Sequence, residues 1–173
     1  SLSLSLWIMS SVSAAPLPWG DRPYSHFSDQ EPLADMLSTL AANEKTPVVI
    51  SAKIKDVISA HYKERPIKSI FDEVVKTYGL TWYFDKDTLY VYKENEVKNA
   101  SVSLTSMTPS EFTETLKRLE VYDPKFKWEM SEVDNVIKFT GPDRFIDMVL
   151  DTAKLMDGHA SKEKRIYKWS DAQ

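Results

Sequence analysis

Two segments of the chain share one order of apolar and polar positions. In residues 67–92, apolar side chains first recur every three or four positions, and two aromatic-rich runs then flank a polar turn at 85–87. Residues 108–139 repeat this order. The first spacing predicts an amphipathic helix, and the apolar runs around a turn predict a β-hairpin. Gly79 follows the first helix, where a left-handed cap residue is favoured. The chain is therefore expected to hold two small α+β modules in tandem.

Further elements are predicted ahead of the first helix and hairpin. A short strand is expected at 24–30. Pro32 then opens a helix that ends near Asn43, because proline needs no hydrogen-bond donor at the first helical position. A buried strand follows at 47–51, and apolar residues within 53–65 favour another strand. The first module then has the order β-α-β-β-α-β-β.

The second module is predicted to have the order β-α-β-β-α. It begins with a strand at 101–107, and Thr108 and Glu111 then form a capping box at the start of a helix. Another helix starts after Pro142 and ends at Gly158. The residues expected on the buried faces of these two helices are Phe112, Leu116 and Leu119, and Phe145, Met148, Val149, Ala153 and Met156.

Part of the aromatic hairpin is expected at the surface, and the last predicted strand is expected to lack a pairing partner. The hairpin of the first module has more aromatic rings than a small core accommodates, so Tyr83 or the pair Tyr90 and Tyr92 is expected on its solvent face. Residues 165–169 are predicted to form a strand with nothing to pair with inside this chain.

The N-terminus has the order of a secretory signal peptide. An apolar run at 2–9 leads into small residues at 10–15, as in the second half of such a signal. The first basic residue is Arg22 and no Met begins the chain, so the chain is expected to start inside the signal. The alternatives are an amphipathic strand, which the Ser-Leu alternation would suit, or an unrelated tail. The run is too short to span a bilayer as a helix.

These patterns predict five parts of the chain. Residues 1–15 are the signal-peptide remnant and 16–23 an extended leader. The first module covers 24–97, and a polar, charged stretch separates it from the second module at 100–160. Residues 161–173 are a linker and the start of a further module.

Composition narrows the classes of function. The 173 residues carry 22 basic and 26 acidic side chains, for a net charge of −4, and the pI is about 5.4. A nucleic-acid-binding domain is usually basic, so no nucleic-acid partner is expected. The β-α-β-β-α order is like that of KH modules, but no Gly-x-x-Gly loop is present to clamp RNA. Without Cys, the chain has no disulfide, no Cys-based zinc site and no thiol nucleophile.

No catalytic constellation is found, so no catalytic, cofactor-binding or metal site is predicted and the chain is not expected to be an enzyme. The histidines fall in different predicted elements without metal-ligand spacing, and the acid pairs fit a helix surface and a turn. The four glycines form no phosphate-binding loop. No small-molecule substrate is expected either. The side chains weighed here are His26, His61, His159, Asp72, Glu73, Asp85 and Asp87.

The order of elements and several short segments resemble a known family. Residues 32–37 leading to 46–51 look like the opening of the first periplasmic domain of secretins, and 79–84 with 87–92 look like its closing hairpin. Residues 101–158 resemble the module that follows it. The chain is thus similar to the N-terminal periplasmic region of a type III secretion system outer-membrane secretin, of the attaching-and-effacing enteric kind.

This resemblance implies a fold and a function. The first module would be like the signalling domain of TonB-dependent receptors, and the second a KH-like ring-building module. The chain would be a periplasmic scaffold in a secretin ring, exported through the general secretory pathway. Its partners would be copies of itself and the inner-membrane ring proteins. A pilotin or the outer-membrane channel domain of the same full-length chain would be further partners. The open alternative is a separate periplasmic module that binds a peptide or receptor through a sheet edge.

Opposite charges on the two predicted helices of the second module suggest a subunit contact. Lys117 and Arg118 lie on one helix, and Asp147 and Asp151 on the other. A head-to-tail contact that closes forms a ring. We therefore expect the basic pair to meet the acidic pair of a neighbouring subunit.

Overall fold

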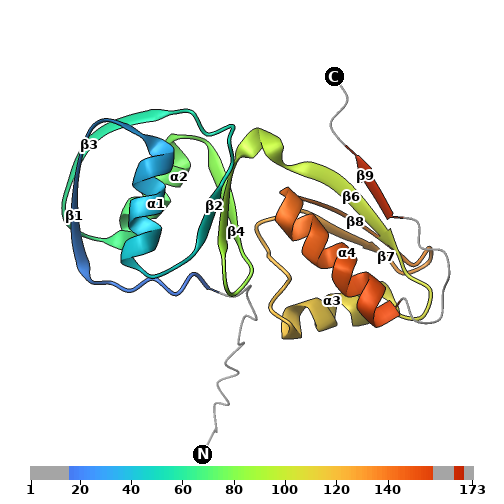
Figure 1. Ribbon diagram of the computed structural model, residues 1–173. Helices are drawn as coiled ribbons and strands as arrows, with labels where there is room; N and C mark the ends of the chain where they lie inside the picture. Colours follow the sequence, from blue (N-terminus) through green and yellow to red (C-terminus); the bar gives the residue numbers. More distant parts are fainter. Residues whose placement is uncertain (1–15, 158–165, 170–173) are drawn as a thin grey trace, which may run out of the picture.

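The computed structural model describes residues 16–157 and the strand at 166–169. The described residues form two domains side by side, each with its own hydrophobic core (Figure 1). This confirms the predicted α+β fold of two small modules. The predicted signal segment at 1–15 lies outside the described residues, and of the predicted linker and further module at 161–173 only the strand at 166–169 is described.

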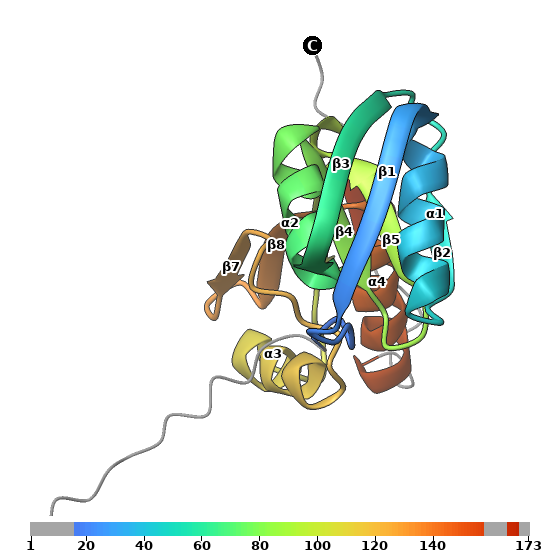
Figure 2. The same cartoon turned by 90° about the vertical axis from the view of Figure 1, so that its left-hand side faces the viewer.

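The first domain encloses two helices between two small sheets. β1 and β3 form an antiparallel ribbon on one side of the helices, and a sheet of order β2-β5-β4 lies on the other (Figures 1 and 2). β2 is parallel to β5, and β4 is antiparallel to it. The predicted β-α-β-β-α-β-β order is found in the elements β1 (Pro23–Pro32), α1 (Leu33–Asn43), β2 (Val48–Ile50), β3 (Val57–Pro66), α2 (Ile67–Thr77), β4 (Leu80–Phe84) and β5 (Leu89–Lys93).

The segment 16–23 contributes to the core of the first domain, although its sequence suggested only an extended leader. Leu17 and Trp19 are each only 7% exposed. The Trp19 indole N–H donates to Thr46 Oγ1 at 3.0 Å, and its ring meets Phe71 edge-on with 5.0 Å between centroids. This segment is held in place by contacts with residues distant in the sequence and not by a helix or strand, so its apolar residues follow no periodic spacing.

The second domain packs two helices on one face of an antiparallel sheet. A short 3₁₀ turn, η1 (Glu94–Glu96), connects the domains, and the sheet has the order β7-β8-β6-β9. α3 and α4 cover one face (Figure 1). The predicted β-α-β-β-α order is found in the elements β6 (Lys98–Ser103), α3 (Pro109–Arg118), β7 (Trp128–Ser131), β8 (Val136–Gly141) and α4 (Asp143–Asp157), and β9 (Ile166–Trp169) follows.

β9 corrects one prediction. The strand was expected to have no partner in this chain, yet it pairs antiparallel with β6, from Asn99 opposite Trp169 to Val102 opposite Ile166. Pairing satisfies backbone groups at the open edge of β6 that would otherwise be free to bind another strand.

The start of the second domain differs from the predicted strand at 101–107, because the strand runs instead from Lys98 to Ser103. The following loop leads to the capping box, which is confirmed. The Glu111 N–H donates to Thr108 Oγ1 at 3.1 Å, and the Thr108 N–H donates to Glu111 Oε2 at 3.3 Å.

Two residues predicted to be buried are exposed. Leu119 and Met156 are each 44% exposed. Leu119 caps the C-terminus of α3, and Val121 takes the place in the core just beyond it. Met156 lies in the last turn of α4, where the buried residue is Asp157. Helical periodicity predicts a face but not the point at which the core ends along it.

Candidate interaction site

Among the described residues, the side chains that could form a metal centre do not come together. No group of three His, Cys, Asp or Glu in residues 16–157 is arranged to hold a metal ion. His26 contacts Glu31 through Nε2 at 2.9 Å, and His61 meets the Phe27 ring at 5.8 Å. His159 lies outside the described residues. Among the helices that the structure describes, none is long and apolar enough to cross a membrane.

The two acid pairs take part in surface and turn interactions. Asp72 and Glu73 form exposed ion pairs with Lys68 and Arg65 on and beside α2. In the turn between β4 and β5, Asp85 Oδ1 accepts the N–H groups of Asp87 at 3.0 Å and Thr88 at 2.7 Å. The predicted turn chemistry is confirmed for Asp85, which has a second role in the contact between the domains.

The β4–β5 hairpin has one face in each domain. Phe84, Leu89 and Val91 point into the core of the first domain. Tyr83 alternates with them, is completely buried, and belongs to the core of the second domain. The expected solvent face of this hairpin is therefore the face that meets the second domain, and the prediction of an exposed Tyr83 is wrong.

Tyr83 is bound at both ends of its side chain. Its ring packs against Phe145 of α4 with 5.3 Å between centroids, and its hydroxyl donates to the Val121 carbonyl oxygen at 2.9 Å. Burial raises the pKa of this phenol well above its ordinary value, and the nearby Asp123 and Asp85 carboxylates raise it further. The hydroxyl therefore stays protonated and remains a donor at neutral pH.

Arg144, at the start of α4, contacts three residues of the hairpin. Its guanidinium donates from Nε and Nη2 to Asp85 Oδ2 at 3.3 and 3.1 Å, and it lies 5.4 Å from the centre of the Tyr90 ring. Its backbone N–H donates to Tyr92 Oη at 3.2 Å. Burial raises the pKa of Tyr92 to about 12, although this hydrogen bond lowers it.

The interface is completed by two lysines. Lys125 of the second domain places its ammonium group 3.4 Å from the centre of the Trp82 ring in β4, and it pairs with the buried Asp123 at 2.9 Å. From the first domain, Lys86 pairs with Glu120 at 3.0 Å. Cation–π contacts and exposed ion pairs are individually weak, so they surround the central contact without dominating it.

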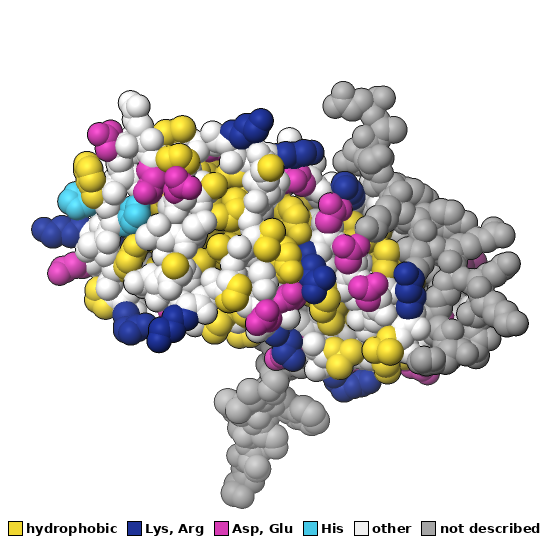
Figure 3. All heavy atoms as spheres, viewed as in Figure 1, with side chains coloured by type: hydrophobic (Ala, Val, Ile, Leu, Met, Phe, Trp, Pro, Cys, Tyr) yellow, Lys and Arg dark blue, Asp and Glu magenta, His cyan; other side chains and the backbone are white. Residues whose placement is uncertain are grey.

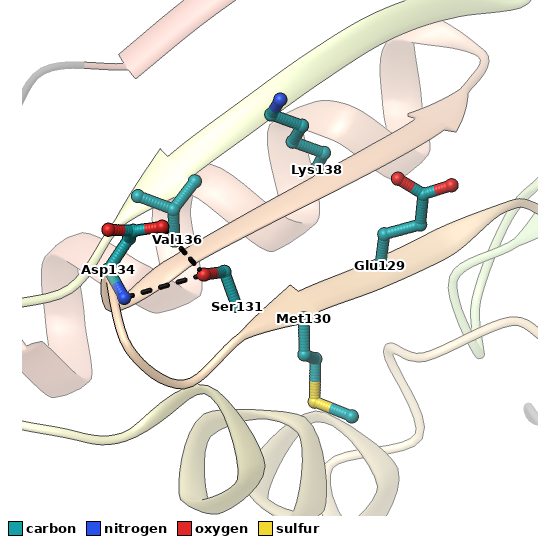
Figure 4. Close-up of a pocket in the computed structure, with 6 residues that line it drawn as sticks. All are labelled: Glu129, Met130, Ser131, Asp134, Val136 and Lys138. Atoms are coloured by element: carbon teal, nitrogen blue, oxygen red, sulfur yellow. Dashed lines mark hydrogen bonds between the residues drawn. The ribbon is translucent and has the colours of Figure 1, made fainter.

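The outer surfaces offer two further candidate sites. On the β1–β3 ribbon, Phe27 is 70% exposed and Val57 is 55% exposed. In the second domain, the sheet face opposite the helices is polar, with a shallow hollow at the β7–β8 hairpin (Figure 4). Glu129 and Lys138 stand on this face, whereas Met130 points to the helical side. In the view of Figure 3, charges of both signs are interspersed and no large patch of a single sign is visible.

The four predicted subunit-contact residues lie in the helical layer of the second domain. Lys117 pairs with Glu114 at 3.5 Å, and Arg118 donates to Thr115 Oγ1 at 3.0 Å from an exposed position. On α4, Asp151 is exposed and Asp147 is half-buried. The basic pair is thus at the end of α3 and the acidic pair on α4, so their meeting across two subunits stays a prediction.

Sequence reasoning missed the contact made by Tyr83 and Arg144. A signal was present in the hairpin, because consecutive aromatic residues, Trp82, Tyr83 and Phe84, place rings on both faces of β4. Such a strand is buried on both faces. The sequence does not say, however, that its second face meets another domain instead of a third layer of the same domain.

Comparison with known proteins finds relatives among the type 3 secretion system secretins. Residues 26–93 match the model of the SPI-1 type 3 secretion system secretin N0 domain. The chain is 28% identical over 155 residues to a type 3 secretion system secretin of Ralstonia nicotianae, covering 90% of this chain and 27% of the relative. It is 28% identical over 126 residues to the SPI-1 type 3 secretion system secretin of Salmonella typhimurium, covering 72% of this chain and 22% of the relative.

Solved structures agree with this result. The fold matches InvG N0N1 in a Salmonella SPI-1 injectisome structure with SpaPQR and PrgHK, with a TM-score of 0.70 and 25% identity over 82% of this chain and 98% of that chain. It also matches a basal-body model of InvG, PrgH and PrgK, with a TM-score of 0.67 and 26% identity over 76% of this chain and 28% of that chain.

These matches are to secretins, so the chain is similar to members of the secretin family. The two domains are similar to the N-terminal region of a type 3 secretion system secretin, as the resemblance in the sequence suggested. Proteins of this family are structural components of a secretion apparatus. The chain spans only 27% and 22% of the lengths of the two curated relatives described above.

Proposed function

We propose that this segment is a periplasmic scaffold of an outer-membrane secretin ring for type III protein secretion. In this role the chain packs against copies of itself and docks to inner-membrane ring proteins. The observation that carries the proposal is the match to InvG N0N1, which covers 98% of that chain in a structure that also holds PrgHK.

Two outer surfaces of the described domains suit these roles. Phe27 and Val57 give the β1–β3 ribbon an exposed apolar surface for a partner on the first domain. In the second domain, the helical layer with Lys117, Arg118 and Asp151 would face a neighbouring subunit. A heterologous contact of this kind closes into a ring when its rotation fits.

The proposal includes location and export. The apolar run at 2–9 followed by small residues at 10–15 supports export through the general secretory pathway, since it resembles the second half of a signal peptide. The segment would then lie in the periplasm as part of an outer-membrane protein, and a pilotin or the outer-membrane channel domain of the same chain would be further partners. The similarity to secretins, which are structural components of a secretion apparatus, supports a role without enzymatic activity.

Crosslinking tests the docking role. This segment has no Cys, so a single Phe27→Cys change in the full-length protein places a thiol on the β1–β3 ribbon. With a bifunctional thiol–amine crosslinker in intact cells, we expect adducts with inner-membrane ring proteins. The matched control is Asn95→Cys, an exposed position in the turn between the domains. Equal labelling from both positions, or none from Phe27→Cys, would contradict docking through this surface.

Charge reversal tests the ring contact. Lys117→Glu with Arg118→Glu in the full-length protein should reduce ring assembly, and a further Asp147→Lys with Asp151→Lys should restore part of it. Ring assembly can be measured from the amount of heat-resistant oligomer on a denaturing gel. Unchanged assembly of the first variant would refute the predicted contact while leaving the scaffold role in place.

A further inference from the structure

The β4–β5 hairpin contributes side chains to the cores of both domains, which restricts how the first domain can be oriented toward its partners. Tyr83 lies in β4 of the first domain but is 0% exposed within the core of the second. Moving the domains apart would bring this ring into water and break its bond to the Val121 carbonyl. A side chain that belongs to the neighbour's core makes separation unfavourable, because both cores lose packed apolar area.

A charged contact fixes the angle between the domains. Asp85 uses one carboxylate oxygen for the turn of its own hairpin and the other for the Arg144 guanidinium. Its side chain is only 9% exposed, and a paired, nearly buried carboxylate is costly to leave without its partner. Arg144 also donates its backbone N–H to Tyr92 Oη. A rotation of α4 against the hairpin would therefore break several directional contacts together.

The connection between the domains is also held in place. Residues 94–97 between β5 and β6 include the 3₁₀ turn η1. The Glu94 N–H donates to the Gly79 carbonyl at 2.9 Å. Glu96 accepts from Ser51 Oγ at 2.8 Å and from the Lys93 N–H at 2.7 Å. Hinges are loop positions that absorb changes of backbone angle, and this connection is instead bonded to the first domain.

We propose that the inner face of the β4–β5 hairpin is a permanent docking surface for the second domain, so that the two domains move as one rigid body whose geometry is set by Tyr83 and Arg144. This inference rests on the proposed function in one respect. In a ring built by the second domains, every first domain would already point toward its partner. Binding then avoids the entropic cost of ordering the first domains, which is the usual benefit of preorganisation.

Residual dipolar couplings of the isotope-labelled chain test the rigid body. One alignment tensor should fit the backbone N–H couplings of both domains in the unaltered chain, and two tensors should be needed for Tyr83→Ala with Arg144→Ala. If that variant does not fold, the milder pair Tyr83→Phe with Arg144→Gln is measured in its place. The matched control is Arg65→Gln, because Arg65 pairs with Glu73 inside the first domain. Two tensors in the unaltered chain, or one in every folded variant, would overturn the proposal.

A second experiment separates this inference from the proposed function. In the full-length protein, the milder pair should leave the amount of heat-resistant ring unchanged. The Phe27→Cys crosslinks to inner-membrane ring proteins should fall about tenfold, equivalent to roughly 1.4 kcal/mol. Arg65→Gln should leave them unchanged. Undiminished crosslinking in the milder pair would overturn only the rigid-body inference, whereas no crosslinks in the unaltered protein would contradict docking itself.

Discussion

Asp157 provides a quantitative test of how the second domain is held together. The residue ends α4, is 1% exposed, and accepts four hydrogen bonds from the loop between β6 and α3. These come from Thr105 N at 2.9 Å and Thr105 Oγ1 at 3.0 Å, and from Ser106 N at 2.6 Å and Met107 N at 2.8 Å. One side chain therefore connects the end of the last helix to the loop that precedes the first helix of the domain.

Replacing Asp157 with Ala should be strongly destabilising. Three backbone N–H groups would lose their charged acceptor, and a hydrogen bond to a charged group contributes about 1.5 to 3 kcal/mol. Thr105 and Ser106 are exposed, so water would replace part of these bonds. The negative charge at a helix C-terminus is itself unfavourable by about 0.3 to 1 kcal/mol, which offsets part of the loss. We expect the free energy of unfolding at pH 7 to fall by about 2 to 4 kcal/mol, because the lost bonds are only partly replaced by water.

The pH dependence follows from the same contacts. Burial would raise the pKa of Asp157, but the bonds from Thr105, Ser106 and Met107 outweigh it and hold the pKa below its ordinary value. The stabilisation is therefore present above the pKa of the unfolded chain, about 3.9, and is lost as the pH falls through the lower pKa of the folded chain. Asp157→Asn should weaken this acid dependence.

Urea unfolding followed by tryptophan fluorescence measures both effects. Asp151→Ala is the matched control, because Asp151 is an exposed carboxylate on the same helix, and surface changes usually stay within about 0.5 kcal/mol. If Asp157→Ala and Asp151→Ala unfold at the same urea concentration, the loop is not held by Asp157 and the reasoning is refuted.

Three other predictions concern local contacts. Trp19→Ala should lower the free energy of unfolding by about 3 to 5 kcal/mol in urea melts, and a loss below 1 kcal/mol would show that the leader is not part of the core. Thr108→Ala should cost about 1 kcal/mol, whereas Thr108→Ser, which keeps the hydroxyl, should cost much less. Tyr92 should ionise near pH 12 in an ultraviolet titration. Since its pKa is raised, its contribution to stability is present below pH 10 and lost as the pH rises through 12. Tyr92→Phe should reduce the absorbance change near pH 12 by that of one tyrosine, and an unchanged titration would contradict the assignment.

The β4–β5 hairpin brings polar groups together at the contact between the two domains. Asp85, Arg144 and Tyr92 are charged or polar groups brought together from distant parts of the chain, as in an active site. Here they are paired with one another across a domain boundary. Their hydrogen bonds and ion pair join the two domains at this contact.

Much of the local structure was determined by the sequence. The order of helices and strands in both domains follows from periodicity, because side-chain spacing reports which face of an element is buried. Thr108 and Glu111 form their capping box within four consecutive residues, and Gly79 has the expected left-handed conformation with φ of +61°. Each of these features depends on neighbours that are close in the sequence.

Only the tertiary structure decided how the distant parts meet. The sequence indicated that Tyr83, Trp19 and 165–169 were apolar or strand-forming, but their partners lie at Val121, Thr46 and β6. The sequence around an aromatic side chain or a strand does not indicate which surface will cover it, because burial depends on the whole arrangement of sheets and helices. Local sequence patterns were enough to suggest the family. The contact between the two domains could be recognised only from the tertiary structure, because it joins residues that are far apart in the sequence.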